Sequence, residues 1–313
     1  MSEVAPLRRV VVKHPDDAVR DAAAIAEEAR ALNYAGTPDL DRARTEYEAF
    51  VRLIADEGAD VLRLPRAGEA GLDSIYARDA SVVSPRGMIL ASMGKAERSG
   101  EPAAQARAFA AWGTPVAGII QPPGRLEGGD VVWLDDRIVA VGRGYRTNAA
   151  GIAQFRAILG DAVDELIEVP LPHWRGPADV FHLMSILSPV DYRLTVVYSP
   201  LMPVPFRERL LDLGFDFIEV PTEEFDSMGA NVLALEPRYC VMLAGNPRTR
   251  ERLEQAGVRV RTYEGREISI KGGGGPTCLT RPVARDADGR KPQDTIPLSN
   301  TASVPLRNST HSA

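Results

Sequence analysis

The residues of this chain best suited to chemistry are few, because its 313 residues include two cysteines and four histidines. Cys278 follows the glycine run 272–275, and a thiol presented by such a side-chain-poor loop suits a reactive thiolate that meets a ligand. Cys240 lies inside the apolar segment 239–243, where we expect it to pack in the core. The glycine run lacks the lysine and hydroxyl residue of a Walker loop. It fits either a flexible surface loop or a close approach of backbone to a ligand.

The four histidines lie in different contexts. His182 opens an apolar stretch, His14 ends the first apolar run, His173 lies in a Pro- and Gly-rich connection, and His311 is near the C-terminus. A histidine beside apolar residues is more often a hydrogen-bonded core residue than a catalyst. A cysteine with a histidine partner, however, forms the nucleophile and base of covalent catalysis.

Carboxylates accompany these candidates. Glu127 and Asp130 belong to the segment Leu-Glu-Gly-Gly-Asp at 126–130, and Asp79 precedes an apolar strand pattern. Negative charge raises the pKa of a thiol and repels its thiolate, which suits attack on a neutral amide poorly. The arrangement becomes sensible for a cationic substrate, because carboxylates can grip a planar guanidinium through two hydrogen bonds. The charge of the guanidinium would then stabilise the attacking thiolate.

A repeated unit must position these residues. It consists of a strand, a turn, a second strand, an amphipathic helix and a third strand, and it begins four times, at Ser81, Asp130, His182 and Asn231. In the copy that begins at His182 we expect the turn at 189–191.

A fifth copy can be assembled from the two ends of the chain. It would place 278–280 beside 9–13, followed by helical stretches at 18–31 and 41–55 and a strand at 61–64. Closing the ring in this way leaves few exposed sheet edges. The sequence therefore predicts the α/β class and a five-bladed α/β propeller of ββαβ units, forming one domain over residues 1–285.

The repeat also predicts a site. Equivalent positions, at or just before the first strand of each unit, hold residues spaced 47 to 52 apart, namely Asp79, Asp130, His182, Asn231 and Cys278. Equivalent positions in a closed ring converge on its axis, so these polar groups are expected to meet at one mouth. Converging polar groups in a concave site are typical of a ligand pocket.

Several segments, in this order, resemble the guanidino-group modifying superfamily, which includes dimethylarginine dimethylaminohydrolase, arginine deiminase and the amidinotransferases. They are 126–130, Arg146-Thr147-Asn148, Phe181-His182-Leu183, 228–232 and the glycine run into Cys278. The resemblance covers about residues 8 to 285. It implies the pentein fold, a five-bladed α/β propeller, with no metal and no organic cofactor.

The resemblance implies a role for each matching residue. Cys278 looks like the nucleophile that forms a covalent amidino-thioether, and His182 like the acid that protonates the departing amine and then activates water. Glu127 resembles the carboxylate that holds the guanidinium and orients the histidine. Asp79 resembles one that binds the other guanidinium nitrogens.

Further residues are predicted to bind the substrate. Arg98 and Arg146 match arginines that pair with the substrate carboxylate in this superfamily, although each could also be an ordinary surface arginine. Asp130 and Asn231 join them through their position in the repeat.

Two departures leave the subfamily open. Met184 stands two residues after the histidine, where arginine deiminases carry an aspartate, and Thr277 precedes the cysteine, where they carry a histidine. These differences favour dimethylarginine dimethylaminohydrolase, whereas the four glycines are closer to the deiminases and amidinotransferases. The leading hypothesis is hydrolysis of a C–N bond of arginine or an N-methylated arginine, giving citrulline and an amine or ammonia. The alternatives are an amidinotransferase and a non-catalytic binding propeller.

Composition excludes several other classes. A formal net charge of −6 offers no footprint for nucleic acid, and the chain lacks an 18-residue apolar run, a signal-like N-terminus and a C-x-x-C pair. We therefore expect a cytoplasmic protein that binds a small cationic guanidino compound, with no membrane or nucleic-acid partner. The polar segment 286–313 is expected to be a disordered tail. The sequence leaves a homo-oligomer open.

Overall fold

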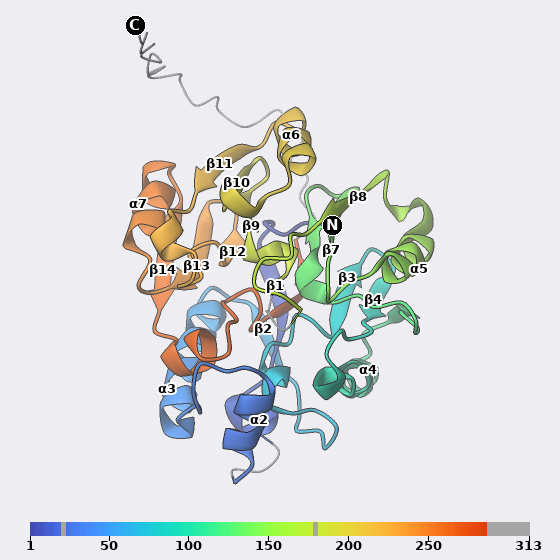
Figure 1. The fold of residues 1–313 in the computed structure, drawn as a ribbon, viewed down its shortest axis with the longest axis vertical. Helices are drawn as coiled ribbons and strands as arrows, with labels where there is room; N and C mark the ends of the chain where they lie inside the picture. The colour runs from blue at the N-terminus through green and yellow to red at the C-terminus, as the bar shows by residue number, and fades with distance from the viewer. Residues whose placement is uncertain (20–22, 178–180, 287–313) are drawn as a thin grey trace, which may run out of the picture.

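The computed structural model describes residues 1–19, 23–177 and 181–286, and these residues form five three-stranded sheets (Figure 1). In each sheet the first two strands are antiparallel, and the third runs parallel to the second after a helical crossover. The predicted ββαβ unit is therefore confirmed as the building block.

Four sheets are built from consecutive segments of the chain. Their strands are β3 (Ser81–Ser84), β4 (Gly87–Leu90) and β5 (Val116–Ile119); β6 (Val131–Trp133), β7 (Ile138–Arg143) and β8 (Glu165–Pro170); β9 (Leu187–Asp191), β10 (Leu194–Val197) and β11 (Asp216–Glu219); β12 (Val232–Glu236), β13 (Tyr239–Leu243) and β14 (Arg259–Tyr263). The crossover helices are α4 (Glu101–Ala111), α5 (Ala149–Leu159), α6 (Val204–Asp212) and α7 (Pro247–Gln255).

The fifth sheet joins the two ends of the chain, as the sequence predicts. Strand β1 (Leu7–Val12) pairs antiparallel with β15 (Arg281–Arg285) and parallel with β2 (Asp60–Arg63). The connection from β1 to β2 carries α1 (Pro15–Ala18), α2 (Ile25–Ala31) and α3 (Leu40–Ala55).

Two of the predicted boundaries are wrong. Residues 278–280 were expected to be a strand, but they lie in a turn in which Leu279 N–H donates to the Gly275 carbonyl (3.1 Å), and β15 begins only at Arg281. Residues 189–191 were expected to form a turn, but they belong to β9. Between His182 and β9 the chain forms a short 3₁₀ turn, η5 (Leu183–Ser185).

Local signals explain where the helices begin and end. The Asn148 side chain accepts a hydrogen bond from Gly151 N–H (2.8 Å) and so caps the start of α5, which ends at Gly160 with φ 55°. Asp39 caps α3 through Asp41 N–H and Arg42 N–H in the same way. Prolines near the start of α6 and α7 suit a position where no helical N–H bond is made.

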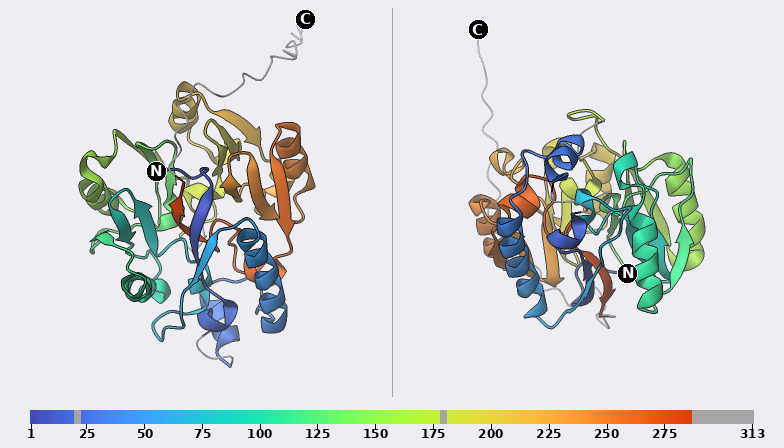
Figure 2. Two further views of the ribbon diagram at one scale, coloured as in Figure 1. Left: turned by 180° about the vertical axis from the view of Figure 1, so that it is seen from behind. Right: turned by 90° about the horizontal axis from the view of Figure 1, so that it is seen from below.

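The first strands lie toward the centre of the molecule and the crossover helices lie around the outside (Figures 1 and 2). Strand β9 contacts β12, β12 contacts β1, and β15 contacts β3. All residues of β10 and β13 are buried, as expected for strands covered on both faces.

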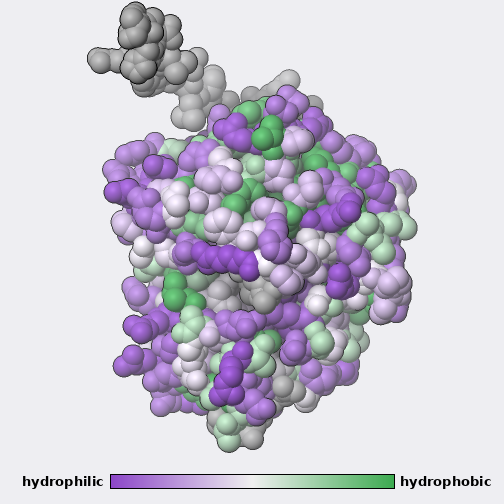
Figure 3. Space-filling model, viewed as in Figure 1, coloured by the Kyte–Doolittle hydropathy of each residue, from purple (hydrophilic) through white to green (hydrophobic). Residues whose placement is uncertain are grey.

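The described surface and chain ends add three observations. The face seen in Figure 3 is mostly hydrophilic with small separate apolar patches. No helix in the described ranges has the length and apolar character needed to cross a bilayer. The predicted disordered tail lies outside the described residues except for Asp286, which donates its N–H to the Pro6 carbonyl (2.9 Å) and pairs with Arg8.

Candidate active site

The five polar residues that share one phase of the repeat all precede the first strand of a sheet. Asp79 comes before β3, Asp130 before β6, His182 before β9, Asn231 before β12 and Cys278 before β15. The fold therefore places them at the same end of the five first strands. Their hydrogen bonds show which of them meet.

His182 lies between two carboxylates. Its Nε2 is 2.7 Å from Glu127 Oε2, and its Nδ1 is 3.9 Å from Asp79 Oδ1. Gly129 allows this approach, since a Cβ at that position would lie 2.6 Å from His182 Nδ1 and 2.9 Å from Asp79 Oδ1. The structure thus brings three of the predicted residues into one buried cluster.

Glu127 is held from two further sides. Its Oε1 accepts a hydrogen bond from Gly94 N–H (2.7 Å), and Arg146 Nη1 lies 3.4 Å from both carboxylate oxygens. The other terminal nitrogen of Arg146 is buried without a partner in the described residues. Arg146 therefore retains a donor for another group, whereas Glu127 has little freedom to rotate.

The charges of this cluster follow from burial and pairing. Burial opposes a charge on His182, but Asp79, Asp130 and Glu127 together raise its pKa to about 9. Burial would raise the pKa of Glu127, but the hydrogen bond and charge of His182, with Arg146, hold it well below its ordinary value. At neutral pH the pair is therefore an imidazolium and a carboxylate, which equips His182 to donate a proton.

Cys278 is partly buried and is held by Asn231. Asn231 Nδ2 lies 3.5 Å from Cys278 Sγ, and Asn231 Oδ1 accepts hydrogen bonds from Thr277 N–H (3.0 Å) and Oγ1–H (2.9 Å). A Cβ on Gly275 would lie 2.5 Å from Asn231 Oδ1, so the end of the glycine run serves a close approach. Burial and the charge of Asp79 raise the pKa of the Cys278 thiol, although Thr277 opposes them. The resting cysteine is thus a thiol.

Asp130 holds two neighbouring segments of this cluster together. Its Oδ1 accepts the Leu183 N–H (3.0 Å) and its Oδ2 accepts the Thr147 hydroxyl (2.6 Å), so both oxygens are already used. Burial raises its pKa to about 6. The contact with Leu183 fixes the residue that follows His182, and Asp130 thereby orients the histidine segment.

The Arg98 side chain is enclosed by the protein and not exposed to solvent. It is 2% exposed, and its guanidinium pairs with Asp79 (2.7 Å) and Glu101 (2.8 Å). Its placement beside Asp79 was expected from neither the repeat nor the motif order.

One set of side chains could hold a metal ion among the described residues. One ligand atom each from Asp79, Glu127 and His182 lies within 4.8 Å of the others. Arg98 already pairs with Asp79 and Arg146 with Glu127, so cations of the protein occupy these carboxylates. The set therefore suits proton transfer between His182 and its carboxylate partners better than a resident divalent ion.

Sequence reasoning missed four residues that build the site. Thr147 hydroxyl accepts Glu127 N–H (3.1 Å) while donating to Asp130, Thr277 anchors Asn231, and Gly129 admits His182. Glu101 pairs with Arg98 three residues earlier, and this spacing on a helical turn was a signal that could have found it. The roles of the other three depend on contacts between distant segments.

Known proteins resemble this chain. A family model described as N,N dimethylarginine dimethylhydrolase, eukaryotic, matches residues 19–285. An N(G),N(G)-dimethylarginine dimethylaminohydrolase of Streptomyces coelicolor is 32% identical over 219 residues, 70% of this chain and 78% of that protein. An arginine deiminase of Mycobacterium avium is 32% identical over 192 residues, which span 51% of this chain and 46% of that protein.

A solved structure shares the fold. A cysteine-to-serine mutant of the dimethylarginine dimethylaminohydrolase of Pseudomonas aeruginosa, in complex with citrulline, matches 88% of this chain and 98% of its own, with a TM-score of 0.71 at 24% identity. This likeness supports the pentein architecture, and the family model covers nearly all of the described residues after α1. The chain therefore belongs to the N,N dimethylarginine dimethylhydrolase family of guanidino-group modifying enzymes.

Proposed function

We propose that this protein hydrolyses a guanidinium C–N bond of arginine or an N-methylated arginine through a covalent intermediate on Cys278, releasing citrulline and ammonia or a methylated amine. Membership of the family makes the chain a hydrolase of guanidino C–N bonds. The observation that carries the proposal is His182, which Glu127 and Asp79 hold as a cation in a buried cluster with the cysteine loop close by.

A bound guanidinium adds a positive charge beside the carboxylates of the resting site. Asp79 raises the pKa of the Cys278 thiol, so a guanidinium that binds beside Asp79 offsets this charge and lets the thiol release its proton to solvent. The unpartnered nitrogen of Arg146 suits the substrate carboxylate. Asn231 holds the sulfur in place for attack.

The first half of the reaction forms the intermediate. The thiolate of Cys278 attacks the central guanidinium carbon, and a C–S bond forms with the sulfur electron pair. His182 gives its proton to the nitrogen that departs, and the C–N bond breaks to leave an amidino-thioether cation. His182 is then a neutral base beside Glu127.

The second half of the reaction uses water. Neutral His182 removes a proton from a water molecule while the water oxygen attacks the same carbon. The C–S bond breaks, the hydroxyl proton returns to the sulfur, and the carbon becomes the ureido group of citrulline. His182 ends protonated, as it began.

The proposal includes closure of the five sheets into a propeller around this site. Contacts of β9 with β12, of β12 with β1 and of β15 with β3 support it, as does the approach of η3 (Gly128–Asp130) to η5. Closure gives the five first strands one common axis. A cytoplasmic location also belongs to the proposal, because Cys278 must stay a free thiol.

Product analysis tests the function. Purified protein is incubated separately with arginine and with asymmetric dimethylarginine, and the products are identified by mass spectrometry. Citrulline with ammonia or dimethylamine is expected from the wild type and not from Cys278→Ala. The matched control is Cys240→Ala, because Cys240 is the other free thiol and is fully buried on β13.

Two results would overturn hydrolysis. Ornithine that forms only when an amine acceptor is added would identify an amidinotransferase instead. No turnover of any guanidine would favour a binding protein. Equal turnover by wild type and Cys278→Ala would overturn the role of Cys278 alone.

A further inference from the structure

We infer that Arg98 and Glu101 are positioning residues that fix Asp79 beside His182, and that Arg98 makes no contact with the substrate carboxylate. This inference rests on the proposed function and deepens it. It also replaces the role that the resemblance suggested for Arg98. The reasons are the number of bonds that Arg98 makes inside the protein and the chain of contacts that leads from it to His182.

Every nitrogen of the Arg98 guanidinium donates inside the protein. Nη1 donates to Asp79 Oδ2 (2.7 Å), Nε to Glu101 Oε1 (2.8 Å) and Nη2 to Glu101 Oε2 (2.9 Å). Nη2 also lies 3.3 Å from the carbonyl oxygens of Asp73 and Tyr76. A substrate carboxylate would have to displace these bonds, whereas Arg146 offers a nitrogen without a partner.

Glu101 holds Arg98 from the start of α4. Both its oxygens accept from Arg98, and such a two-point pair fixes direction as well as distance. As the first residue of its helix, the carboxylate also has the favourable end of the helix dipole. Glu101 therefore fixes the plane of the Arg98 guanidinium.

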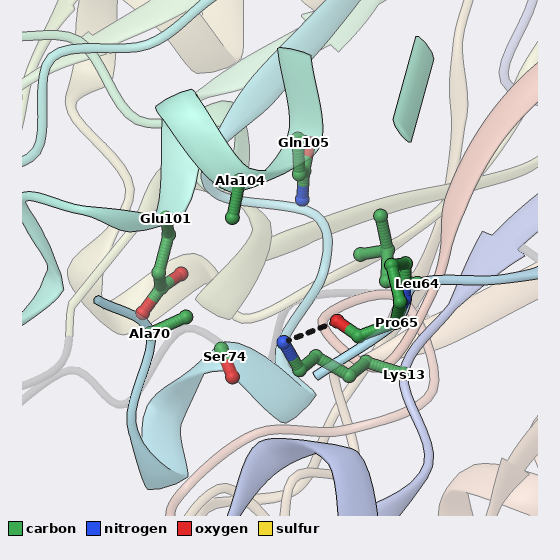
Figure 4. A pocket seen from close by; sticks show the side chains of 8 residues that line it. All are labelled: Lys13, Leu64, Pro65, Ala70, Ser74, Glu101, Ala104 and Gln105. Atoms are coloured by element: carbon green, nitrogen blue, oxygen red, sulfur yellow. Dashed lines mark hydrogen bonds between the residues drawn. The ribbon is translucent and has the colours of Figure 1, made fainter. Parts of the chain in front are cut away.

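Two small cavities are lined in part by Glu101. One is lined by Lys13, Ser74, Gln105 and Glu101 itself, with Lys13 Nζ turned toward the Pro65 carbonyl (3.3 Å) (Figure 4). The other is lined by carboxylates and apolar groups, namely Glu28, Asp73, Glu97, Ala31 and Leu32, together with Gly71 and Glu101. Neither cavity is lined by Cys278 or His182, so Glu101 borders spaces that are separate from the reacting atoms.

Asp79 connects this pair to the chemistry. One oxygen, Oδ2, accepts from Arg98, and the other, Oδ1, accepts Gly129 N–H (3.1 Å) and faces His182 Nδ1 at 3.9 Å. Asp79 raises the pKa of both His182 and Cys278. The chain from Glu101 through Arg98 and Asp79 to His182 thus sets where this negative charge lies.

Ionisation of Glu101 gives the inference a signature in the pH profile. Burial raises its pKa to about 7, and Arg98 opposes this rise. The charged groups around it are Arg98, Asp73, Asp79 and Lys13, and Glu28 and Glu97 line the same cavity as Glu101. Protonation of Glu101 weakens its hold on Arg98, so kcat is expected to fall below about pH 7 through this residue.

The test compares kcat with KM in Arg98→Lys and Glu101→Gln. Misplacement of Asp79 should lower kcat by about tenfold to a hundredfold with a smaller rise in KM, because Asp79 also meets the substrate guanidinium, and Glu101→Gln should flatten the acid limb of the kcat profile. The matched control is Arg209→Lys. Arg209 lies on the outer helix α6 and makes a two-point pair with Glu165, the first residue of β8. A rise in KM with kcat retained would show that Arg98 binds substrate and would overturn the inference.

A second measurement works without turnover. Alkylation of Cys278 by iodoacetamide is followed against pH in wild type, Arg98→Lys and Arg98→Met. Arg98→Met leaves the Asp79 charge uncompensated, so the midpoint should rise by about one pH unit, and Arg98→Lys should restore most of the shift. No shift in Arg98→Met overturns the positioning role. This result is distinguishable from failure of the proposed function, in which the midpoint shifts but no guanidine is hydrolysed.

Discussion

His182 lies 2.7 Å from the Glu127 carboxylate and 3.9 Å from that of Asp79, while the cysteine it serves is a protonated thiol. In this resting state His182 and Cys278 both carry a proton. In the proposed reaction the imidazolium holds the proton that the departing amine needs, and the thiol ionises when the cationic substrate binds. The proposal therefore has the substrate activate the nucleophile.

The pH dependence of stability tests the charge of His182. Its pKa is about 9 in the folded chain against an ordinary value of 6.5, so its stabilising contribution is complete below pH 6.5 and is lost as pH rises toward 9. The free energy of unfolding should fall on the order of 3 kcal/mol more over this interval in wild type than in His182→Gln. Urea unfolding at several pH values measures it. Parallel curves for the two proteins would contradict the assignment.

Gly129 shows how an element shapes the site. It lies in the short 3₁₀ turn before β6, where an added Cβ would meet both His182 and Asp79 at under 3.0 Å. Gly129→Ala must therefore push His182 from its place and should lower kcat at least about tenfold. Steady-state kinetics and thermal unfolding of the variant check this.

The control for Gly129→Ala is a substitution at Gly144, directly after strand β7. Gly144→Ala adds a Cβ that meets only Leu171, at 3.5 Å, which is ordinary contact. It should keep wild-type kinetics. Equal kinetics of the two variants would show that the turn before β6 can move away without affecting His182.

Element boundaries were predictable where the local signal acts alone. The bounds of α5 follow from the Asn148 cap and Gly160, and both are local. The β9 boundary was wrong because proline usually ends a strand, whereas here Pro189 lies in an edge strand and the register with β10 shifts beside it, between Leu194 and Thr195. Such a bulge depends on the partner strand, which the local sequence does not reveal.

The residues of the site, like the element boundaries, were predictable only where the sequence itself carries a signal. The repeat phase pointed to Cys278 and His182 and the motifs to Glu127. The structure brings His182 within 2.7 Å of Glu127, and the catalytic roles of all three residues stay predictions. The bond of Arg98 to Asp79 could not be predicted, since no local spacing links residues 79 and 98, whereas Glu101 lies only three residues after Arg98. Its burial is a property of the tertiary structure.

At the scale of the whole molecule, residues near the N-terminus contact Arg78 and strand β15, next to the turn that carries Cys278. The Arg78 side chain is fully buried and its Nη2 donates to Glu3 (2.8 Å), while Arg285 Nη1 donates to the Ala5 carbonyl (2.6 Å). The Arg78 backbone N–H donates to the Cys278 carbonyl (3.2 Å). The N-terminal segment therefore supports the turn that carries the nucleophile.

Glu3 is the residue on which this support depends. Burial opposes its charge, but Arg78 and Arg285 hold its pKa below the ordinary value, so it is a carboxylate at neutral pH. Glu3→Gln leaves the buried Arg78 without its charged partner and should lower the free energy of unfolding by about 3–5 kcal/mol. Urea unfolding at pH 7 measures this loss. Asp286→Asn removes the exposed pair with Arg8 and should cause no measurable change. No loss in Glu3→Gln would mean that strand pairing alone holds the N-terminal segment, with no special contribution from the buried carboxylate.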